Sequence, residues 1–590
     1  MNQTHTTISP GSPDTSGHLW SILFNPIIVK CVHSRLRLKH ILSWGLITLT
    51  ITAFVCLMVY LTTTERELMT PPEAARAMLL PLIIIQGIIL MLLGTGSVAS
   101  GLAVERDTGV IAYQRMTPMS PLAKMIGYLF GLPIREYFLF LLTVPFVAFA
   151  VIVSKFEVSK LLHFYAVFFS SVWVYHMTGM VVGMAWSKPR RAAMITQGFV
   201  VLLYLVLPQL SAIGLTFFEF LTVRPTFKAM LLDELKDVSE SLRQVAEQRF
   251  ASAIGTDEIG FFNWMLHPTT YTLIVQGFLL CTMIVVVLRK WKNDHAHPFS
   301  KLYGLFFHGI VTTLLVGSVW PILSNESLLR LFSKQFPDQQ PAFILFLLLM
   351  TMLTVSGVFL ILVVHVTTPS RFTMAEGIRL NMKQGHSRWV TLTSDASSSL
   401  LLTCCITAIT AVGAWILIEH ARQTGVFLTI FPPTWVLLQP LLFGVLVVFF
   451  VQGIRERFST RMCYVILFIL WMVPAFTAMV LYSAKNAWVG GTYTALPNPF
   501  AALLFTWFWV YEHAGLDGDQ FLKGLPTDFR HHLPMFAATS IGLYAVLAAV
   551  IQAERLRWHL TMLKRERLHG RPTAGTPEDT AQEKAAPQAG

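Results

Sequence analysis

Long apolar stretches alternate with short polar ones through most of this sequence. Twelve of the apolar stretches hold few or no charged residues over about 20 positions, the length an α-helix needs to cross the hydrocarbon core of a bilayer. The pattern predicts an all-α polytopic membrane protein with twelve transmembrane helices. The predicted spans are Ile41–Thr63, Ala77–Gly101, Met125–Val153, Leu161–Trp186, Met194–Phe217, Thr269–Leu288, Leu302–Leu323, Ala342–Val366, Ser399–Ile418, Thr434–Val451, Met462–Leu481 and Leu533–Ile551.

The layout of these spans repeats once along the chain. Six spans fall within residues 41–290 and six within residues 301–553. In each half the longest polar loop precedes the last span, and these two loops cover residues 222–266 and 483–532. A repeated layout of this kind is typical of transporters built from two related sets of helices, so we predict two six-helix halves.

The segments that flank the two halves are polar. Residues 1–40 begin with a stretch rich in Pro, Ser and Thr. This stretch lacks the basic start and apolar core of a cleavable signal peptide, so we expect the first span to direct insertion. Residues 554–590 are basic at first and then have a composition typical of disorder.

Charge indicates the orientation in the membrane. The sequence is 54% hydrophobic and 13% charged, with a formal net charge of +12. Its bases lie in short loops between spans rather than on one face, which argues against nucleic-acid binding. By the positive-inside rule the loops with most bases are cytoplasmic, so we expect a plasma-membrane protein with both termini in the cytoplasm. These bases include Lys30, Arg35, Arg37, Lys39, Lys188, Arg190, Arg191, Arg289, Lys290, Lys292, Arg371, Arg379, Lys383, Arg388, Arg455, Arg457, Arg461, Arg555, Arg557, Lys564, Arg565 and Arg567.

Two stretches of the long outer loops have a pattern of their own. Thr226–Phe250 has apolar residues at helical spacing among charged ones, which predicts an amphipathic helix outside the bilayer. Phe500–Tyr511 is rich in Phe and Trp, which suits an interfacial or re-entrant segment. The six cysteines lie in or beside apolar spans or in the N-terminal segment, so we expect no structural disulfide.

A polar island, Glu105–Lys124, separates the second span from the third. We expect it to form an amphipathic helix at the membrane surface, although an ordinary connecting loop would also fit. Thr117, Pro118 and Ser120 supply turn and cap chemistry where the third span begins. The positions expected to face lipid or protein are Val110, Ile111 and Met116, and those expected to face water are Arg106, Gln114 and Arg115.

The spans carry little that points to catalysis. Arg135 and Glu136 are the main ionisable pair inside a span, and the histidines in spans are isolated. We find no zinc-binding His-Glu-x-x-His, no Cys-x-x-Cys, no Gly-x-Ser-x-Gly elbow and no phosphate-binding loop. The glycine pairs Gly127/Gly131 and Gly179/Gly183 favour close helix approach instead. We therefore expect no enzyme activity, metal site or cofactor in this chain.

The N-terminal Asn25-Pro26-Ile27-Ile28-Val29-Lys30, with Arg35-Leu36-Arg37 before the first span, resembles the opening of permease subunits of ABC exporters of the six-span class. The island resembles the cytoplasmic coupling segment of that family. Its acidic, Gly-containing start is followed by a Thr-Pro-x-Ser step into the third span. In the family likeness, the coupling residues are Glu105, Arg106, Asp107, Gly109, Arg115, Thr117, Pro118 and Ser120.

The second half carries a weaker version of the same segment. Its island, Pro369–Asp395, keeps an acidic residue before a glycine, whereas Ser387–Asp395 stands where the Thr-Pro-x-Ser step would be. The weaker coupling candidates are Glu376, Gly377, Arg379, Lys383 and Arg388.

The resemblance implies an exporter permease with two fused halves, driven by a separate ABC ATPase in two copies, with ATP and Mg²⁺ bound on that partner. The residues also leave open a secondary transporter that needs no ATPase, or a membrane scaffold. Transport by the chain alone in liposomes, driven by an ion gradient, would favour the secondary transporter, and partner binding without solute flux would favour the scaffold. The substrate is not encoded in any pattern that we recognise.

Overall fold

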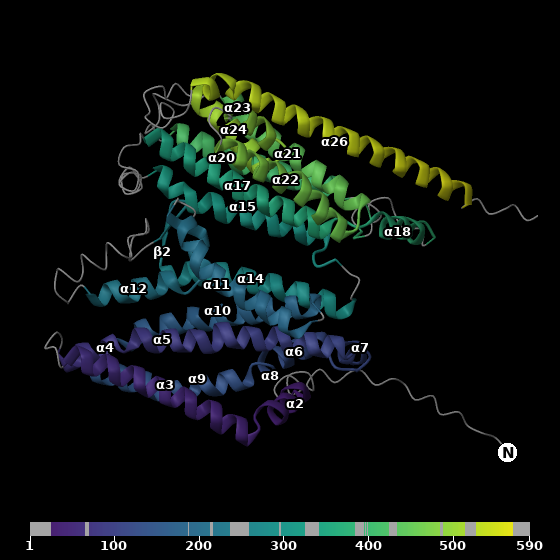
Figure 1. Ribbon diagram of the computed structural model, residues 1–590. Coiled ribbons are helices and arrows are strands. Elements are labelled where there is room, and N and C mark those ends of the chain that lie inside the picture. The colour runs from purple at the N-terminus through teal and green to yellow at the C-terminus, as the bar shows by residue number, and fades with distance from the viewer. Residues whose placement is uncertain are drawn as a thin grey trace, which may run out of the picture. The chain divides into compact units, whose positions relative to one another are not determined.

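A computed structural model describes residues 25–569 apart from 65–69, 187, 213–215, 236–258, 294–296, 325–340, 384–393, 396, 398, 424–433, 484–487 and 514–526. The chain divides into two compact units. The first consists of Met1–Ala212, Thr216–Gly260 and Trp264–Pro298, and the second of Ile213–Leu215, Phe261–Asn263 and Phe299–Gly590. Each is almost entirely helical (Figure 1).

Within the described residues, ten helices are long and apolar enough to cross a membrane. They account for ten of the twelve predicted spans, which confirms the polytopic all-α class. These helices are Leu38–Thr64, Pro71–Asp107, Ile134–Ser154, Val158–Ala185, Pro268–Lys292, Lys301–Leu323, Leu400–Gln423, Gln439–Arg457, Met462–Tyr482 and His531–Met562.

The other two predicted spans fall on helices outside this set. The predicted span Met194–Phe217 corresponds to α11 (Pro189–Ala212), and Ala342–Val366 corresponds to α17 (Pro341–Thr367). The last part of α17, Val355–Thr367, pairs with Arg371–Gly377 as an apolar helix bent by 56°. The count is therefore ten spans, or eleven with this bent pair, among the residues that the structure describes.

The first unit is built around α10 (Val158–Ala185), which packs against the second, fifth and sixth predicted spans. The other described helices of this unit are labelled where space allows in Figure 1. They are α2 (Pro26–Arg35), α3 (Leu38–Thr64), α4 (Pro71–Ala77), α5 (Leu79–Gly87), the π-helix η1 (Ile88–Gly94), α6 (Thr95–Asp107), α7 (Val110–Arg115), α8 (Pro121–Gly131), α9 (Ile134–Ser154), α11, a short 3₁₀ helix η2 (Thr216–Leu221), α12 (Arg224–Leu235) and α14 (Pro268–Lys292).

Small residues let α6 and α10 approach closely. A Cβ atom added at Gly179 would lie 2.9 Å from the carbonyl oxygen of Thr95, and one added at Gly183 would lie 2.7 Å from that of Ala99. Because these neighbours are backbone atoms, neither site can take a larger residue without moving a helix. The close approach predicted from this glycine pair is confirmed.

The predicted third span, Met125–Val153, is broken near its start. Helix α8 ends at Gly131 and α9 begins at Ile134, with Pro133 between them. Proline has no backbone N–H to donate to the preceding turn and its ring displaces the carbonyl there, which interrupts the helix. The expectation of one continuous helix is wrong at this point.

The second unit has a different packing order. Helix α21 (Thr434–Arg457) packs along α26 (Thr527–His569), and α15 (Lys301–Ser324) packs along α20 (Leu400–Gln423). Phe443, Phe450 and Tyr544 form the centre of the contact between α21 and α26. Among the described residues, the remaining helices of this unit are α17, α18 (Arg371–Lys383), α22 (Thr460–Ser483), α23 (Trp488–Ala495) and α24 (Pro499–His513).

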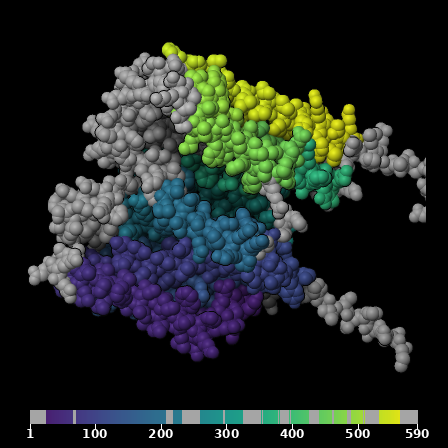
Figure 2. Space-filling model, in the orientation of Figure 1, coloured from purple at the N-terminus to yellow at the C-terminus, as the bar shows by residue number. Residues whose placement is uncertain are grey.

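Several helices expose long apolar faces. In the first unit the outward side chains of α3 include the exposed Leu46, Ile51 and Phe54, and α2 and α3 form much of the purple surface in Figure 2. Exposed apolar side chains along a span are typical of helices that contact lipid. These faces agree with a membrane protein.

Both long loops contain helices of their own. In the first, α12 covers the start of the predicted amphipathic stretch, and a short hairpin, β1 (Ile259–Phe261) and β2 (Trp264–Leu266), precedes α14. The rest of Thr226–Phe250 lies outside the described residues. In the second loop, α24 contains the aromatic stretch and packs against α21 and α26.

Candidate functional site at the helix ends of the first unit

The segment Glu105–Lys124, here called the α6–α8 segment, does not form one helix. Glu105, Arg106 and Asp107 belong to the end of α6, which is continuous with the second span. Gly109 then adopts a left-handed conformation with φ of 77° and turns the chain into α7. Glycine adopts this conformation without the steric cost that a Cβ atom adds. The prediction of a single amphipathic helix is therefore wrong, and only Val110–Arg115 forms a separate short helix.

Helix α7 has one buried side and one exposed side. Ile111 is 4% exposed and lies in the core cluster with Val98 and Leu102 of α6. Tyr113 and Met116 are 67% and 78% exposed. Both side chains lie on the exposed side of α7 or at its end.

The end of the segment is fixed by local hydrogen bonds. The Thr117 hydroxyl donates to the carbonyl of Gln114 at 2.7 Å. Ser120 is the N-cap of α8, and its side-chain oxygen accepts from the amide of Ala123 at 3.1 Å. Pro121 occupies the first helical position, where its missing N–H costs nothing. The cap predicted from the sequence is present, and Pro118 is exposed on the preceding turn.

Three arginines donate hydrogen bonds to main-chain carbonyls at the C-terminal ends of three helices around the segment. Arg106 donates to the carbonyl of Met184 in the last turn of α10. Arg115 donates to the carbonyls of Trp291 and Lys290, at 3.1 and 3.2 Å, in the last turn of α14. Carbonyls at a helix C-terminus lack intrahelical donors and carry partial negative charge, so a guanidinium stabilises them. Arg35 of α2 likewise donates to the carbonyl of Leu132, at 2.7 Å, at the end of α8.

This arrangement corrects the expected faces. Arg106, Gln114 and Arg115 were expected to face water, but all three are half-buried and the two arginines are engaged within their own unit. Sequence periodicity placed them on a polar face, and it could not show that helix ends from distant parts of the chain meet there. Asp107 is exposed, as are Tyr113 and Met116.

Glu105 links the segment to α2 and α8. Its carboxylate pairs with Lys30 of α2 at 2.7 Å and accepts a hydrogen bond from the Tyr128 hydroxyl at 2.9 Å. Burial, aided by the nearby carboxylate, raises the pKa of Tyr128 well above its usual range, so the phenol keeps its proton. The phenol therefore remains a donor to Glu105 at all physiological pH values.

Lys124 holds the last turn of α7 against the start of α8. Its ammonium donates to the carbonyls of Gln114 and Thr117, at 2.5 and 3.2 Å. The side chain is 3% exposed, and burial lowers the pKa of Lys124 below its usual value. Lys124, the last residue of the α6–α8 segment, therefore bonds the end of α7 to the start of α8.

The sequence analysis missed the structural part that α2 plays. Asn25 caps α2 through the amide of Ile27 and also donates to the carbonyl of Ala123, at 2.5 Å, in α8. A Cβ atom at Gly127 would lie within 3 Å of the Asn25 amide group, so α2 and α8 lie in direct contact. The signal was the Asn-Pro pair, which is typical of a helix N-cap followed by its first residue.

The corresponding residues of the second unit lie on α18. Glu376 and Arg379 are exposed and Gly377 is buried. Lys383 is the last residue of the helix, and Arg388 lies outside the described residues. Arg371, in the first turn of α18, pairs with Glu554 of α26 at 3.5 Å and lies 5.4 Å from the ring centroid of Trp558. The four described candidates, Glu376, Gly377, Arg379 and Lys383, thus belong to one helix, and Arg371 joins its start to α26.

Buried ionisable groups inside the spans have partners in their own unit. Glu136 of α9 is fully buried and bonds Ser97 and Arg135, both at 2.6 Å. In the second unit Glu456 and Arg555 form a buried ion pair at 2.5 Å. Among the described residues, no group of three or more His, Cys, Asp or Glu side chains lies close enough to hold a metal ion.

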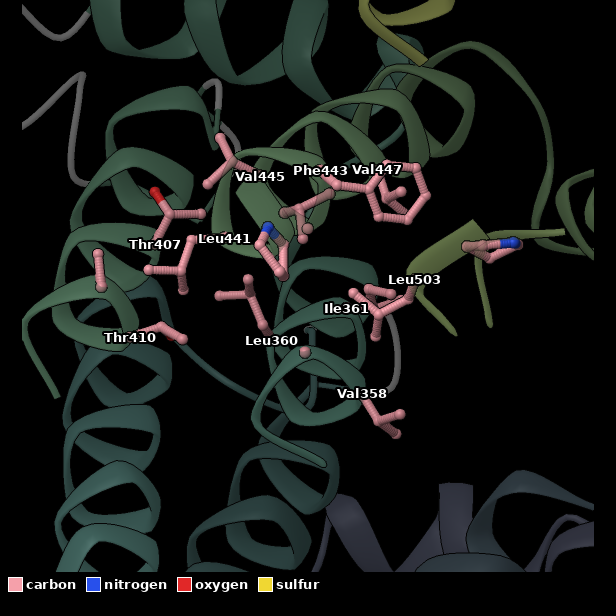
Figure 3. A pocket seen from close by; sticks show the side chains of 16 residues that line it. Val358, Leu360, Ile361, Thr407, Thr410, Leu441, Phe443, Val445, Val447 and Leu503 are labelled. Atoms are coloured by element: carbon pink, nitrogen blue, oxygen red, sulfur yellow. The ribbon is translucent and has the colours of Figure 1, made fainter. Parts of the chain in front are cut away.

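Both units contain apolar spaces, and the first unit has a second one, of about 470 Å³, between α3 and α9. In the second unit, α17, α20, α21 and α24 surround a cavity of about 90 Å³, and the labelled side chains in Figure 3 converge on it. The hydroxyls of Thr407 and Thr410, which line it, donate to main-chain carbonyls of their own helix. The polar groups of these two side chains are therefore hydrogen-bonded. In the first unit, α5, η1 and α11 line an open groove of about 500 Å³.

Comparison of the chain with protein-family models, with curated proteins and with solved structures found no match in any of the three.

Proposed function

We propose that this chain is the membrane-spanning subunit of an ATP-binding-cassette transporter of the exporter class, and that a separate ATPase docks on the α6–α8 segment from the cytoplasm. In this proposal the chain carries no catalytic residue. ATP and Mg²⁺ bind to the partner, of which two copies serve the two units, and the protein lies in the plasma membrane with both termini in the cytoplasm.

The observation that supports the proposal is the way α7 is mounted. Arg115 of α7 bonds the end of α14, and Lys124 of α8 bonds the end of α7. Glu105 and Arg106, at the end of α6 just before α7, bond α2, α8 and α10. A force applied to the exposed side of α7 would therefore reach several spans together, because packed helices move as rigid bodies. A plain connecting loop needs none of these contacts.

The docking face differs from the one that the sequence suggested. Arg106 and Arg115 hold the fold, so the contact with the ATPase falls on Asp107, Tyr113 and Met116. Tyrosine and methionine are enriched at the centres of protein interfaces, where large apolar contacts dominate the binding energy. An exposed carboxylate beside them serves orientation more than affinity.

The test is co-expression with an ATPase that carries a Walker A sequence and is encoded next to this chain. We expect the Tyr113→Asp/Met116→Asp double variant to insert normally and to lose ATPase co-purification and stimulation by about tenfold or more, as for a central interface pair. The matched control is Trp264→Asp/Met265→Asp on β2, where the two side chains are 68% and 64% exposed.

The control variant should behave as the wild type, because β2 precedes the start of α14 whereas α7 contacts its end. If the α7 variant retains and stimulates the ATPase normally, the docking assignment is wrong. If ion gradients drive transport by the purified chain alone, the secondary-transporter alternative replaces it.

A further inference from the structure

The groove in the first unit has an apolar floor and walls. It is lined by Ile88 and Met91 of η1, by Val201 and Leu205 of α11 and by Phe168 of α10. The hydroxyl of Tyr204, the polar group on the α11 side, donates to the sulfur of Met91 at 3.3 Å. A space lined in this way favours a hydrocarbon over water.

The groove faces away from the centre of its unit. Leu205 is 67% exposed and Ile84, on α5, is 52% exposed, and both line the groove. Both residues lie on apolar helices, and such exposed apolar sides contact lipid acyl chains. An amphiphile from the bilayer can therefore enter sideways.

One end of the groove is charged. Arg224, at the start of α12, lines it with a side chain that is 34% exposed, and its Nε lies 3.7 Å from the buried Glu219 carboxylate. Lys228 follows one turn later and is largely buried, and that burial lowers its pKa. Among the residues that line the groove Arg224 is the one with a charged side chain, and a guanidinium matches phosphate and carboxylate geometry.

The helix that forms the floor departs from regular α geometry beside the groove. The second span turns into the π-helix η1 over Ile88–Gly94 and returns to α-helix at Thr95. Such π segments occur frequently at functional sites, because the wider turn redirects side chains. Gly87 precedes η1 and lines the groove, and a Cβ atom added there would meet no atom within 4 Å.

From these observations we infer that the groove between α5, η1 and α11 binds the hydrocarbon chain of an anionic amphiphile whose head group contacts Arg224. The inference goes beyond the proposed docking of an ATPase and does not depend on it. The cavity in the second unit serves as an internal comparison, since its lining carries no charged side chain.

The experiment uses the purified full chain in phosphatidylcholine nanodiscs. Two photoreactive lipids carry the same diazirine-labelled acyl chain, one with a phosphatidylglycerol head group and one with phosphatidylcholine. After illumination, the labelled peptides are identified by mass spectrometry. We expect the anionic probe to label the α5–η1 and α11 peptides about fivefold more than the zwitterionic one, as one partly exposed charge-assisted contact predicts.

Three variants localise the site. Arg224→Gln should bring the ratio of the two probes close to one while labelling persists. Gly87→Leu should reduce labelling by both probes at least about fivefold, since the added side chain fills the groove. Gly198→Leu is the matched control, because Gly198 is exposed on α11, has open space at its Cβ position and does not line the groove.

Leu205→Trp provides a second way to fill the groove from an exposed position, should Gly87→Leu fail to fold. Equal labelling of the wild type by the two probes would overturn the inference. So would wild-type labelling in the filled variants, or no labelling of these peptides by either lipid, as expected if protein covers the groove.

Discussion

The polar interval that follows the second span of each predicted six-span half is built differently in the two units. In the first, α6 ends at Asp107 with Arg106 bonded to the end of α10, a left-handed glycine turns the chain, and the short α7 is bonded through Arg115 to the end of α14. In the second, the last part of α17 bends by 56° into the longer α18, and Arg371 joins this helix to α26.

The difference shows that a repeated layout need not repeat its contacts. In the first interval Arg106 and Arg115 bond helix-end carbonyls, whereas in the second Arg371 forms an ion pair with the partly exposed Glu554. Carbonyl contacts fix a backbone position, whereas exposed ion pairs are weak and sensitive to salt. We therefore expect the α6–α8 segment to be the more rigid of the two intervals.

The largest effect should come from the buried ion pair of the second unit. Glu456→Ala leaves Arg555, whose side chain is 5% exposed, without its carboxylate. Removing one partner of a buried pair costs about 3 kcal/mol or more of stability. Thermal unfolding of the purified protein should show a marked loss, and Glu456→Leu/Arg555→Met should recover most of it. A double variant no better than the single one would contradict the pairing.

The next effect should come from the glycine turn of the first unit. Gly109→Val places a β-branched residue at φ of 77° and should cost about 2 kcal/mol, whereas Gly109→Asn should cost less, because asparagine tolerates this conformation. No atom lies within 4 Å of an added Cβ at this position, so any loss reports on the backbone alone. Equal stability of the two variants would refute the left-handed turn.

A smaller effect is expected at Arg115. Arg115→Gln removes donors from the two carbonyls at the end of α14 and should cost about 1 kcal/mol. The matched comparison is Arg371→Gln in α18, whose partly exposed ion pair with Glu554 should contribute less than about 1 kcal/mol. If the two variants have the same effect, the contrast between the two intervals fails.

The smallest effect is expected at the Lys30–Glu105 pair. The lysine side chain is 53% exposed, so Lys30→Ala should change stability by less than about 1 kcal/mol and the change should shrink in high salt. Tyr128→Phe removes a more buried hydrogen bond to the same carboxylate and should be insensitive to salt. A large salt-dependent loss for Tyr128→Phe would show that this ranking is wrong.

The sequence predicted the helical class well because apolar runs of membrane-spanning length are a local property. Ten of twelve spans and the Ser120 cap followed from this local information. The break at Pro133 was signalled by the proline itself, but the surrounding apolar run made one helix look continuous.

The candidate site was predictable only in part. The start of α8 was predicted from Ser120 and Pro121, whereas the turn at Gly109 was not predicted, although glycine is the residue that most readily adopts its left-handed conformation. The positions of Arg106 and Arg115 do not follow from the sequence, because their partners are main-chain carbonyls 78 and about 175 residues away. Every residue has a main-chain carbonyl, so the residue types along the sequence could not indicate these contacts. Asn25 likewise acts through the carbonyl of Ala123.

The central claim, that the exposed side of α7 meets a partner in the cytoplasm, is tested most directly by thiol labelling. Met116→Cys and Met265→Cys are placed separately in a chain whose six native cysteines are replaced, and each is treated with a membrane-impermeant maleimide. The account predicts that Cys at 116 reacts in inverted vesicles and not in intact cells, while Cys at 265 shows the reverse. Reaction of the 116 variant in intact cells would contradict it.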